Sequence, residues 1–374
     1  MDTVQKRTWA EIDLGNLEEN YRALRGLTGE GCRFLGVVKA NAYGHGAIPV
    51  ARRLEELGAE YLAVACLDEA VELRQAGLSG PILILGVTPP ELGEELIHWD
   101  LTQSVGDLGT AEALSELAVQ KGKRLKVHVK ADTGMSRLGF LCTGQAGERA
   151  GAEIARLCRL PGLEPEGIFT HFANADGDET LTMLQFQHFM ALLKQLEERG
   201  IVFQIRHCAA SAAVLNYPCT HLDMIRPGIA LYGHYPAKGM ERLCPLKPVM
   251  SLKTRIYAVR ELPAGSKVSY GCTRTLERES KVAVLPVGYA DGLPRLVSDQ
   301  LQVSIRGRKV PLLGRVCMDM CMADVTSLPE AAVGDIVAIY GDGCPVEPAA
   351  ELAGTISYEL LCRVAPRVPR VYKG

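Results

Sequence analysis

The chain has 374 residues, 47% of them hydrophobic and 23% charged, which is the composition of a globular protein, and at about 150 residues per domain it predicts two or three domains. Its formal net charge of −3 disfavours nucleic-acid and membrane-surface binding, because both need a basic patch. No apolar run suits a transmembrane helix or a signal peptide, and the twelve cysteines include no CxxC pair, so we expect a cytoplasmic protein with reduced thiols.

Short apolar runs alternate with helical patterns between residues 34 and 226. Apolar residues recur every three or four positions in 48–58, 68–77 and 181–200, and each of these predicted helices ends in a glycine. Eight apolar runs, each followed by a helix or turn, predict a (β/α)8 barrel. A doubly wound open sheet is the alternative, but eight parallel strands in about 200 residues favour closure. The predicted strands are 34–39, 61–67, 81–86, 101–105, 125–131, 167–172, 203–208 and 224–226.

The pattern changes beyond residue 245 and predicts a second, antiparallel β domain. Polar and apolar residues alternate there with period two, with Gly or Pro between the segments. Thr8–Leu14 is a further strand, surplus to the barrel, and we expect it to pair with the β domain. The predicted organisation is therefore an N-terminal strand in 1–14, a barrel in 15–244 and a β domain in 245–374. The alternating segments are 249–262, 281–291, 301–320 and 333–341.

Polar side chains end five of the predicted strands. Lys39, Lys130, His171, His207 and Arg226 close the first, fifth, sixth, seventh and eighth strands. Barrels of this kind carry their active sites at the C-terminal ends of the strands. This coincidence predicts an active site at that end.

Lys39 lies in the run VVKANAYGHG (37–46). Burial lowers the pKa of a lysine, and such an amine can act as a Schiff-base nucleophile. The alternative is a lysine that extends to the barrel rim and keeps its charge in water. Tyr43 favours the first interpretation because it can donate a hydrogen bond to a ligand. Gly44 and Gly46 favour it because they let the backbone approach a ligand closely.

A phosphate site is predicted after the seventh and eighth strands, where barrels often bind phosphate. Ser211 begins a short helix, whose exposed N–H groups could bind an anion, and Gly228 and Ile229 follow Arg226. The alternative for Ser211 is a helix N-cap. His171 and His207 can also be polar residues lining the barrel mouth. A metal site is the weaker hypothesis, because no HxH or carboxylate cluster completes a coordination set.

The sequence resembles the bacterial alanine racemase family, which depends on pyridoxal phosphate (PLP) and combines a barrel with a C-terminal β domain. The resemblance runs from AEIDLGNLEENYRAL (10–24) to RVPRVY (367–372). Several motifs in order are far more specific than one. Besides VVKANAYGHG they are KADTGMSRLG (130–139), FTHFANAD (169–176), MIRPGIALYG (224–233), VSYG (268–271), PVGYADG (286–292) and GRVCMDM (314–320).

The resemblance implies a homodimer that racemises alanine and supplies D-alanine for peptidoglycan. Lys39 would carry PLP and act as the base on the D-side, and Tyr270, lent by the other subunit, would be the second base. Lys130 would be carbamylated, which turns a cation into an anion that can hydrogen-bond Arg137. The implied cofactor contacts are Lys39, Tyr43, Arg137, His171, Ser211, Arg226, Gly228, Ile229 and Tyr358. The implied substrate contacts are Arg137 and Met318, and the implied access path is Asp176, Tyr289, Arg295 and Arg315.

One departure and three rival functions accompany this resemblance. Ala210 stands where the family commonly has Asn, which puts a contact from residue 210 in doubt. The rivals are a serine or broad-specificity racemase, a PLP-dependent decarboxylase and a PLP carrier without catalysis. VSYG and MIRPG argue against the decarboxylase, and a β domain of about 130 residues argues against a single-domain carrier.

Overall fold

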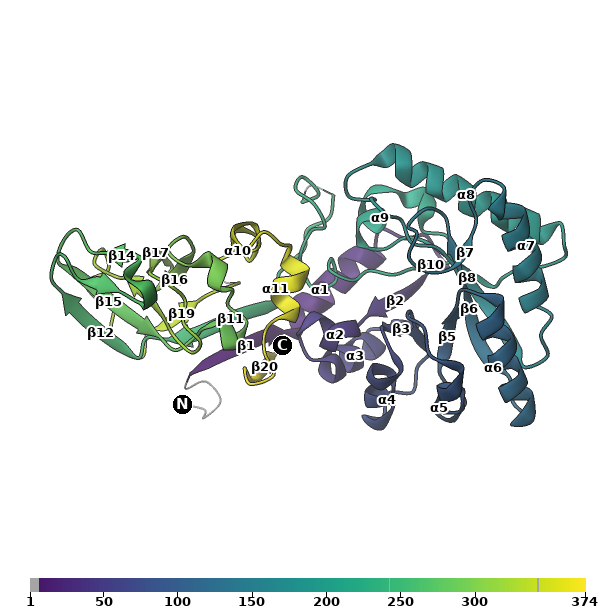
Figure 1. The fold of residues 1–374 in the computed structure, drawn as a ribbon, viewed down its shortest axis with the longest axis horizontal. Coiled ribbons are helices and arrows are strands. Elements are labelled where there is room, and N and C mark those ends of the chain that lie inside the picture. The colour runs from purple at the N-terminus through teal and green to yellow at the C-terminus, as the bar shows by residue number, and fades with distance from the viewer. Residues whose placement is uncertain (1–6, 242, 342) are drawn as a thin grey trace. The chain divides into compact units, whose positions relative to one another are not determined.

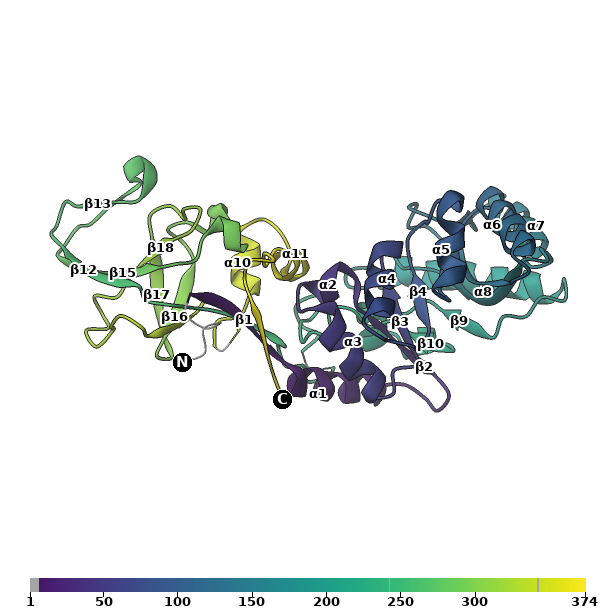
Figure 2. The same ribbon diagram turned by 90° about the horizontal axis from the view of Figure 1, so that it is seen from below.

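The computed structural model describes residues 7–241, 243–341 and 343–374, and the chain divides into two compact units. One contains the described residues up to Leu17, the short segment Tyr43–Gly46, and Pro248–Gly374; we call it the β unit. The other contains Glu18–Ala42 and Ala47–Lys247; we call it the barrel unit. Figures 1 and 2 show the mainly β character of the first and the mixed strands and helices of the second.

Eight parallel strands form the core of the barrel unit, in the order β10-β2-β3-β4-β5-β6-β8-β9. Ala210 and Arg226, which follow β9 and β10, form a parallel bridge, so the two edges of the sheet also meet. Helices cover the outside of this sheet (Figure 1), and the predicted barrel is confirmed. The strands are β2 (Arg33–Val37), β3 (Tyr61–Val64), β4 (Ile82–Ile84), β5 (Thr102–Val105), β6 (Leu125–Asp132), β8 (Leu163–Phe169), β9 (Ile205–His207) and β10 (Met224–Ile225), and β7 (Phe140–Leu141) pairs with β6.

The helices predicted at 48–58, 68–77 and 181–200 are present, and each begins and ends within three residues of its predicted bounds. The carboxylates of Asp107 and Asp178 cap α6 and α8 by accepting hydrogen bonds from backbone N–H groups, at 2.8 and 2.9 Å. Gly58 and Gly77 take positive φ just after α3 and α4, where a left-handed residue ends a helix. The helices are α1 (Leu14–Arg25), α2 (Lys39–Tyr43), α3 (Ala47–Glu56), α4 (Leu67–Gln75), α5 (Gly93–His98), α6 (Leu108–Gln120), α7 (Ala146–Leu157), α8 (Glu179–Glu197) and α9 (Ser211–Asn216).

The β unit is built on nine strands in the order β12-β15-β18-β17-β16-β19-β11-β1-β20. The strand β1 (Thr8–Asp13) pairs antiparallel with β11 and parallel with β20, so the first and the last strands of the described chain lie side by side in this sheet. The remaining strands are β11 (Met250–Arg255), β12 (Ala258–Leu262), β15 (Ser280–Leu285), β16 (Gln302–Ile305), β17 (Arg308–Leu313), β18 (Cys321–Asp324), β19 (Ile336–Ala338) and β20 (Arg370–Lys373). Two short helices, α10 (Glu347–Leu352) and α11 (Ser357–Cys362), and the hairpin of β13 (Lys267–Val268) and β14 (Arg274–Thr275) complete the unit.

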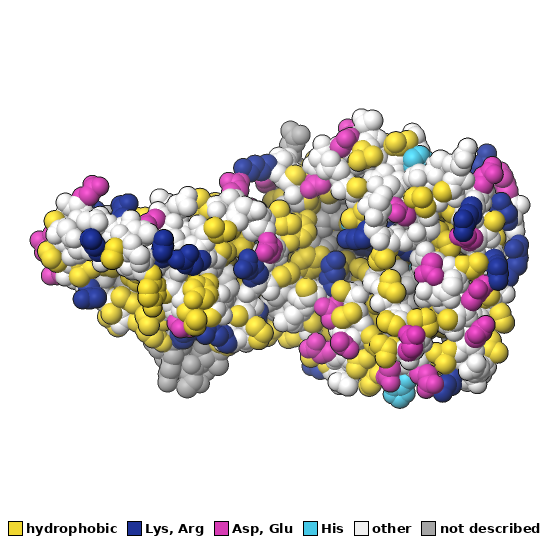
Figure 3. Space-filling model, in the orientation of Figure 1, with side chains coloured by type: hydrophobic (Ala, Val, Ile, Leu, Met, Phe, Trp, Pro, Cys, Tyr) yellow, Lys and Arg dark blue, Asp and Glu magenta, His cyan; other side chains and the backbone are white. Residues whose placement is uncertain are grey.

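The surface in Figure 3 carries acidic and basic side chains interspersed over the barrel unit, with no field of one sign on that face. This distribution agrees with the small net charge of the chain. Within the described ranges, no helix combines the length and the apolar character needed to cross a membrane.

Candidate active site

Lys39 is the first residue of a left-handed turn rather than the last residue of a strand, because β2 already ends at Val37. Ala40, Asn41 and Ala42 all have φ of 53° and ψ near 50°, and Tyr43 has the same φ. A left-handed residue other than glycine costs about 1–2 kcal/mol. Strained backbone of this kind persists only where neighbouring contacts enforce it, and such contacts cluster at functional sites.

Two side chains hold this turn. The carboxylate of Glu69 accepts hydrogen bonds from the N–H groups of Ala40 and Ala65, both at 2.7 Å, and so joins the turn to the end of β3. The side-chain oxygen of Asn41 accepts a hydrogen bond from the N–H of Ala47 at 2.7 Å, at the start of α3. Glu69 was not foreseen from the sequence, since a glutamate in the first turn of a helix is ordinary.

Arg226 lies buried after β10 and donates four hydrogen bonds. Its Nη1 donates to His207 Nδ1 at 2.9 Å. Its Nη2 shares two N–H groups among three acceptors, the carbonyls of Thr170 at 2.8 Å and Cys208 at 3.2 Å and the Nδ1 of His171 at 3.3 Å. Burial lowers the pKa of Arg226 to about 10, so the guanidinium stays charged at neutral pH. Its Nε–H makes no hydrogen bond within the described residues and remains available to a ligand.

The guanidinium determines which nitrogens of the two histidines carry protons. A guanidinium has only donors, so His171 Nδ1 and His207 Nδ1 must both act as acceptors. Burial and then the charge of Arg226 hold the pKa of both histidines well below the ordinary value, so both are neutral. Each therefore carries its single proton on Nε2 and can only donate from that nitrogen.

Four cations act on His171. After burial, its pKa is lowered by Arg226, Lys130, Arg137 and Lys39, in that order. The Nζ of Lys130 and the Cζ of Arg226 lie 4.7 and 5.3 Å from the centre of the same Phe169 ring. Burial and then Arg226 and Arg137 lower the pKa of Lys130 to about 7. The structure thus brings together four of the five residues predicted at the strand ends, Lys130, His171, His207 and Arg226, although Lys130 lies inside β6 and His171 lies beyond β8.

A turn at residues 228–230 wraps around the hydroxyl of Ser211. The Ser211 Oγ accepts hydrogen bonds from the N–H groups of Gly228 at 2.9 Å and Ala230 at 3.2 Å, which leaves its own O–H to donate. Ser211 is not the N-cap of α9, because Ala210 occupies that position. The N–H of Ile229 makes no hydrogen bond in the described parts of the chain. These donors suit an anionic group.

The β unit presents Tyr270 at an exposed turn, with 71% of its surface accessible. Ser269 and Gly271, on either side, both have positive φ. The Ser269 Oγ donates to the carbonyl of Arg315 at 2.6 Å, and a Cβ at position 271 would lie 2.6 Å from Arg315 Nη1. The turn of Tyr270 and the Arg315 segment are therefore closely packed.

Tyr289 and Met318 are tied to each other through backbone. The N–H of Tyr289 donates to the carbonyl of Cys317, and that of Ala290 to the carbonyl of Met318, both at 3.0 Å. Gly288 allows this approach, because a Cβ there would lie 2.3 Å from both carbonyl oxygens. The side chains of Tyr289 and Met318 are 44% and 53% exposed.

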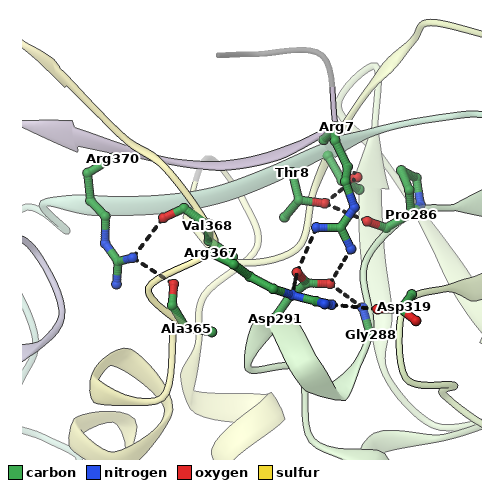
Figure 4. Close-up of polar contacts among 11 residues, drawn as sticks. Arg7, Thr8, Pro286, Gly288, Asp291, Asp319, Ala365, Arg367, Val368 and Arg370 are labelled. Atoms are coloured by element: carbon green, nitrogen blue, oxygen red, sulfur yellow. Dashed lines mark hydrogen bonds and ion pairs between the residues drawn. The ribbon is translucent and has the colours of Figure 1, made fainter.

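Asp291 anchors this segment from inside the β unit (Figure 4). Its buried carboxylate accepts two hydrogen bonds from Arg7 and one from Arg367, all at 2.8 Å, and one from the N–H of Gly288 at 2.9 Å. The motif PVGYADG contains Asp291, but its arginine partners come from the two ends of the chain. Its partners could therefore not be read from the sequence.

The other predicted site residues lie apart from these clusters or show fewer contacts. Tyr43 packs beside Tyr358 within the β unit, with ring centres 6.2 Å apart. Asp176 and Arg137 are exposed on the barrel unit, and Arg295 is exposed on the β unit.

Both units match a known family. Residues 12–236 match the family "Alanine racemase, N-terminal domain", and residues 249–372 match "Alanine racemase, C-terminal domain". The chain belongs to the alanine racemase family. It is 48% identical to an alanine racemase of Desulforamulus reducens over 370 residues, which cover 98% of this chain and 99% of that protein.

Solved structures of the alanine racemase family share the whole fold. The alanine racemase of Clostridium difficile 630 superposes with a TM-score of 0.94 at 40% identity, covering 100% of this chain and 97% of that one. The same protein in complex with cycloserine gives a TM-score of 0.92 at 38% identity, covering 99% of this chain and 96% of that one. The resemblance stated from the motifs is confirmed.

Proposed function

We propose that this chain interconverts L- and D-alanine with PLP bound at Lys39, as a cytoplasmic homodimer. The observation that carries the proposal is a positively charged barrel end, where Arg226 hydrogen-bonds the half-buried His171 and where Lys130, Arg137 and Lys39 also lower the pKa of that histidine. Such a site suits a ligand that carries both phosphate and carboxylate groups. All twelve cysteines are free thiols, which supports a reducing compartment.

The residues present fit PLP. The Nε–H of Arg226 can donate to the ring nitrogen, and the Ile229 N–H and the Ser211 hydroxyl can donate to the phosphate. The family resemblance adds Gly228, Tyr43 and Tyr358 to the phosphate contacts. When bound, PLP supplies an electron sink for negative charge at the substrate's α-carbon.

Two bases would act on opposite faces of that carbon. Racemisation removes a proton from one face and returns one to the other, and a single side chain cannot easily reach both. We assign the D-side to the Lys39 amine and the other face to the partner subunit's Tyr270. The neutral His171 would donate its Nε2 proton to the phenol oxygen, which keeps that oxygen an acceptor.

Arg226 would limit the reaction to racemisation. A guanidinium donates a hydrogen bond to the ring nitrogen but does not readily give up its proton. The negative charge is then less widely delocalised than it would be over a protonated ring. Side reactions such as transamination are expected to be slow for this reason.

Lys130 would carry a carbamate. With a pKa of about 7, much of the amine is neutral at physiological pH and can attack CO2. A C–N bond forms, one proton is released, and the resulting anion can accept a hydrogen bond from Arg137. The net change removes a cation from a cluster of four and adds an anion.

The remaining predicted residues would handle the substrate. Arg137 and Met318 would hold its carboxylate. Ala210, which replaces the family's common Asn, would leave the cofactor one contact fewer. The access path would be lined by Asp176, Tyr289, Arg295 and Arg315.

The decisive experiment incubates the purified protein and PLP with L-alanine and follows D-alanine by optical rotation or chiral chromatography. We expect equal amounts of the two enantiomers at equilibrium. Binding of PLP without any D-alanine would refute the proposal. The ratio of kcat/KM for L-alanine and L-serine tests the preference, since a small pocket rejects one added hydroxyl by only about 10²-fold.

A further inference from the structure

The hydrogen bonds of Arg226 end on neutral groups, although its charge is buried. Its acceptors are two imidazoles and two backbone carbonyls, and no carboxylate of the described residues forms an ion pair with it. A buried charge is costly unless something compensates it. A negative charge that compensates Arg226 in this barrel would therefore have to act through intervening groups.

A string of side chains runs from Arg226 through the barrel interior to Glu166. His207 Nε2 and His128 Nδ1 are hydrogen-bonded at 2.8 Å. His128 Nε2 and Glu166 Oε2 are 3.5 Å apart, which is an ion-pair distance rather than a hydrogen bond, and neither of these two buried atoms has another hydrogen-bond partner among the described residues. The two histidine side chains are fully buried, whereas the carboxylate of Glu166 is 19% exposed.

Arg226 at one end of the string and Glu166 at the other allow only one placement of the ring protons of His207 and His128. His207 donates from Nε2, so His128 Nδ1 must accept. Burial lowers the pKa of His128, which makes it neutral, and its one proton then lies on Nε2, pointing toward Glu166. The string begins at a group that can only donate and ends at one that, when ionised, can only accept. Every dipole in it is therefore aligned in the direction that favours the charge of Arg226.

The backbone is adapted to this string. The pairing of β6 with β8 shifts between Val127 and His128, which face Pro165 and Gly167, so Glu166 is the extra residue of a β-bulge. Bulges re-aim side chains and often lie beside active sites. At Gly167 a Cβ would lie 2.6–2.8 Å from three atoms of the His128 ring, so this ring occupies the space that only glycine leaves free.

Packing also fixes the rings. Phe169 stacks on His207 with centres 4.8 Å apart and an interplanar angle of 10°, and His128 meets His207 edge-on at 5.0 Å. Neither imidazole can turn without displacing an aromatic neighbour.

We propose that Glu166 is the remote counter-charge of Arg226, acting through His128 and His207, and that Glu166 and His128 are positioning residues for racemisation. This proposal rests on the proposed function, in which Arg226 faces the PLP ring. Glu166 compensates the buried charge of Arg226 and fixes its direction without touching cofactor or substrate.

The first test reads the protons directly, without turnover. The holoenzyme is labelled with 15N-histidine, and the ring nitrogens of His128 and His207 are assigned from the signals lost in His128→Gln and in His207→Gln, respectively. We expect both residues to be neutral with the proton on Nε2. A proton on His128 Nδ1, or on both of its nitrogens, would overturn the proposal whether or not the protein racemises alanine.

The second test measures kcat per PLP-containing site at a temperature well below unfolding. Glu166→Gln should lower kcat about threefold to tenfold with little change in KM, the size expected for coupling through a network. Glu166→Asp should restore most of the loss. Gly167→Ala, which removes no charge but displaces the His128 ring, should act like Glu166→Gln.

The matched control is Glu164→Gln, the same substitution at an exposed position of the same strand. It should leave kcat unchanged. If Glu166→Gln equals this control in an enzyme that racemises alanine, the proposal fails while the proposed function stands. If Glu166→Gln loses folded protein but keeps kcat per folded site, its role is structural and the proposal also fails.

Discussion

The two units hold their chemically important side chains in opposite ways. In the barrel unit His207, Arg226 and Lys130 are at most 7% exposed, and hydrogen bonds or ring contacts from the same unit orient them. In the β unit Tyr270 and Met318 are more than half exposed, and their backbone rather than their side chains is held in place. The barrel groups are positioned by their own unit. The β-unit groups are presented outward, which suits residues that complete a site on another molecule.

The largest expected effect is the loss of kcat on substitution of the exposed Tyr270, which tests whether this outward-facing side chain takes part in the reaction. Tyr270→Phe should lower kcat by about 10²–10⁴-fold, the usual contribution of an acid–base residue. PLP absorbance should persist, because Lys39 is untouched. Racemisation at the wild-type rate in this variant would contradict the two-base assignment.

A mixing experiment sharpens the same point. Lys39→Ala and Tyr270→Phe subunits are each inactive, but a mixed dimer with shared sites contains one intact site. Random exchange should therefore restore about a quarter of the wild-type activity per chain, since half of the dimers are mixed and half of their sites are intact. A mixture that stays inactive after exchange would show that each site is built from one chain.

The next effect concerns Asp291, the buried carboxylate that holds the segment carrying Tyr289. Asp291→Asn leaves Arg7 and Arg367 without their shared, fully buried carboxylate. The unfolding free energy should fall by about 1–3 kcal/mol, because charged hydrogen bonds are lost while both arginines keep access to water. Urea unfolding measures this loss. Asp319→Asn, which removes an exposed contact to the same Arg367, should cost less than about 1 kcal/mol. Equal losses in the two variants would mean that burial of Asp291 does not matter.

Asp291 also predicts a pH dependence. Burial alone would raise its pKa, but hydrogen bonds from Arg7 and Arg367 lower it below the ordinary value of 3.8. The stability it contributes is therefore complete above that value and is lost as the pH falls through the lower folded-state pKa. In Asp291→Asn, the unfolding free energy should change less steeply with pH over the range in which Asp291 becomes protonated.

A smaller effect tests the buried amine of the barrel. With 13C-bicarbonate, a carbamate signal from Lys130 should appear above pH 7 and fade as the pH falls below it, because a lysine with a pKa of about 7 is protonated there. The signal should be absent in Lys130→Ala and present in Lys126→Ala, which alters the same strand. We expect Lys130→Ala to lower kcat about tenfold through the lost support of Arg137.

Sequence patterns predicted strands and helices better than they predicted tertiary contacts between side chains. The eight barrel strands and the helices predicted at 48–58, 68–77 and 181–200 followed from periodicity and glycine signals, because these depend on neighbours along the chain. His128 and Lys130 lie two residues apart in one strand and so share a face, which could have marked His128 as an interior group. Glu166 could not be placed, because a bulge in a distant pairing sets its direction. The arginine partners of Asp291 likewise depend on how the chain ends meet.

The smallest expected effect concerns the left-handed turn after Lys39. Ala40 is exposed with φ of 53°, so Ala40→Gly should relieve strain and raise the unfolding free energy by about 0.5–1 kcal/mol. Ala152→Gly, at an exposed position inside α7, should lower it by about 1 kcal/mol, because that backbone is ordinary helix. If thermal or urea unfolding shows that Ala40→Gly raises the unfolding free energy while Ala152→Gly lowers it, then the left-handed turn, rather than the loss of an alanine, explains the stabilisation. If Ala40→Gly also lowers kcat while stabilising the fold, then the strain held by Glu69 and Asn41 contributes to the placement of Lys39, and a rigid turn is part of how the barrel presents its amine.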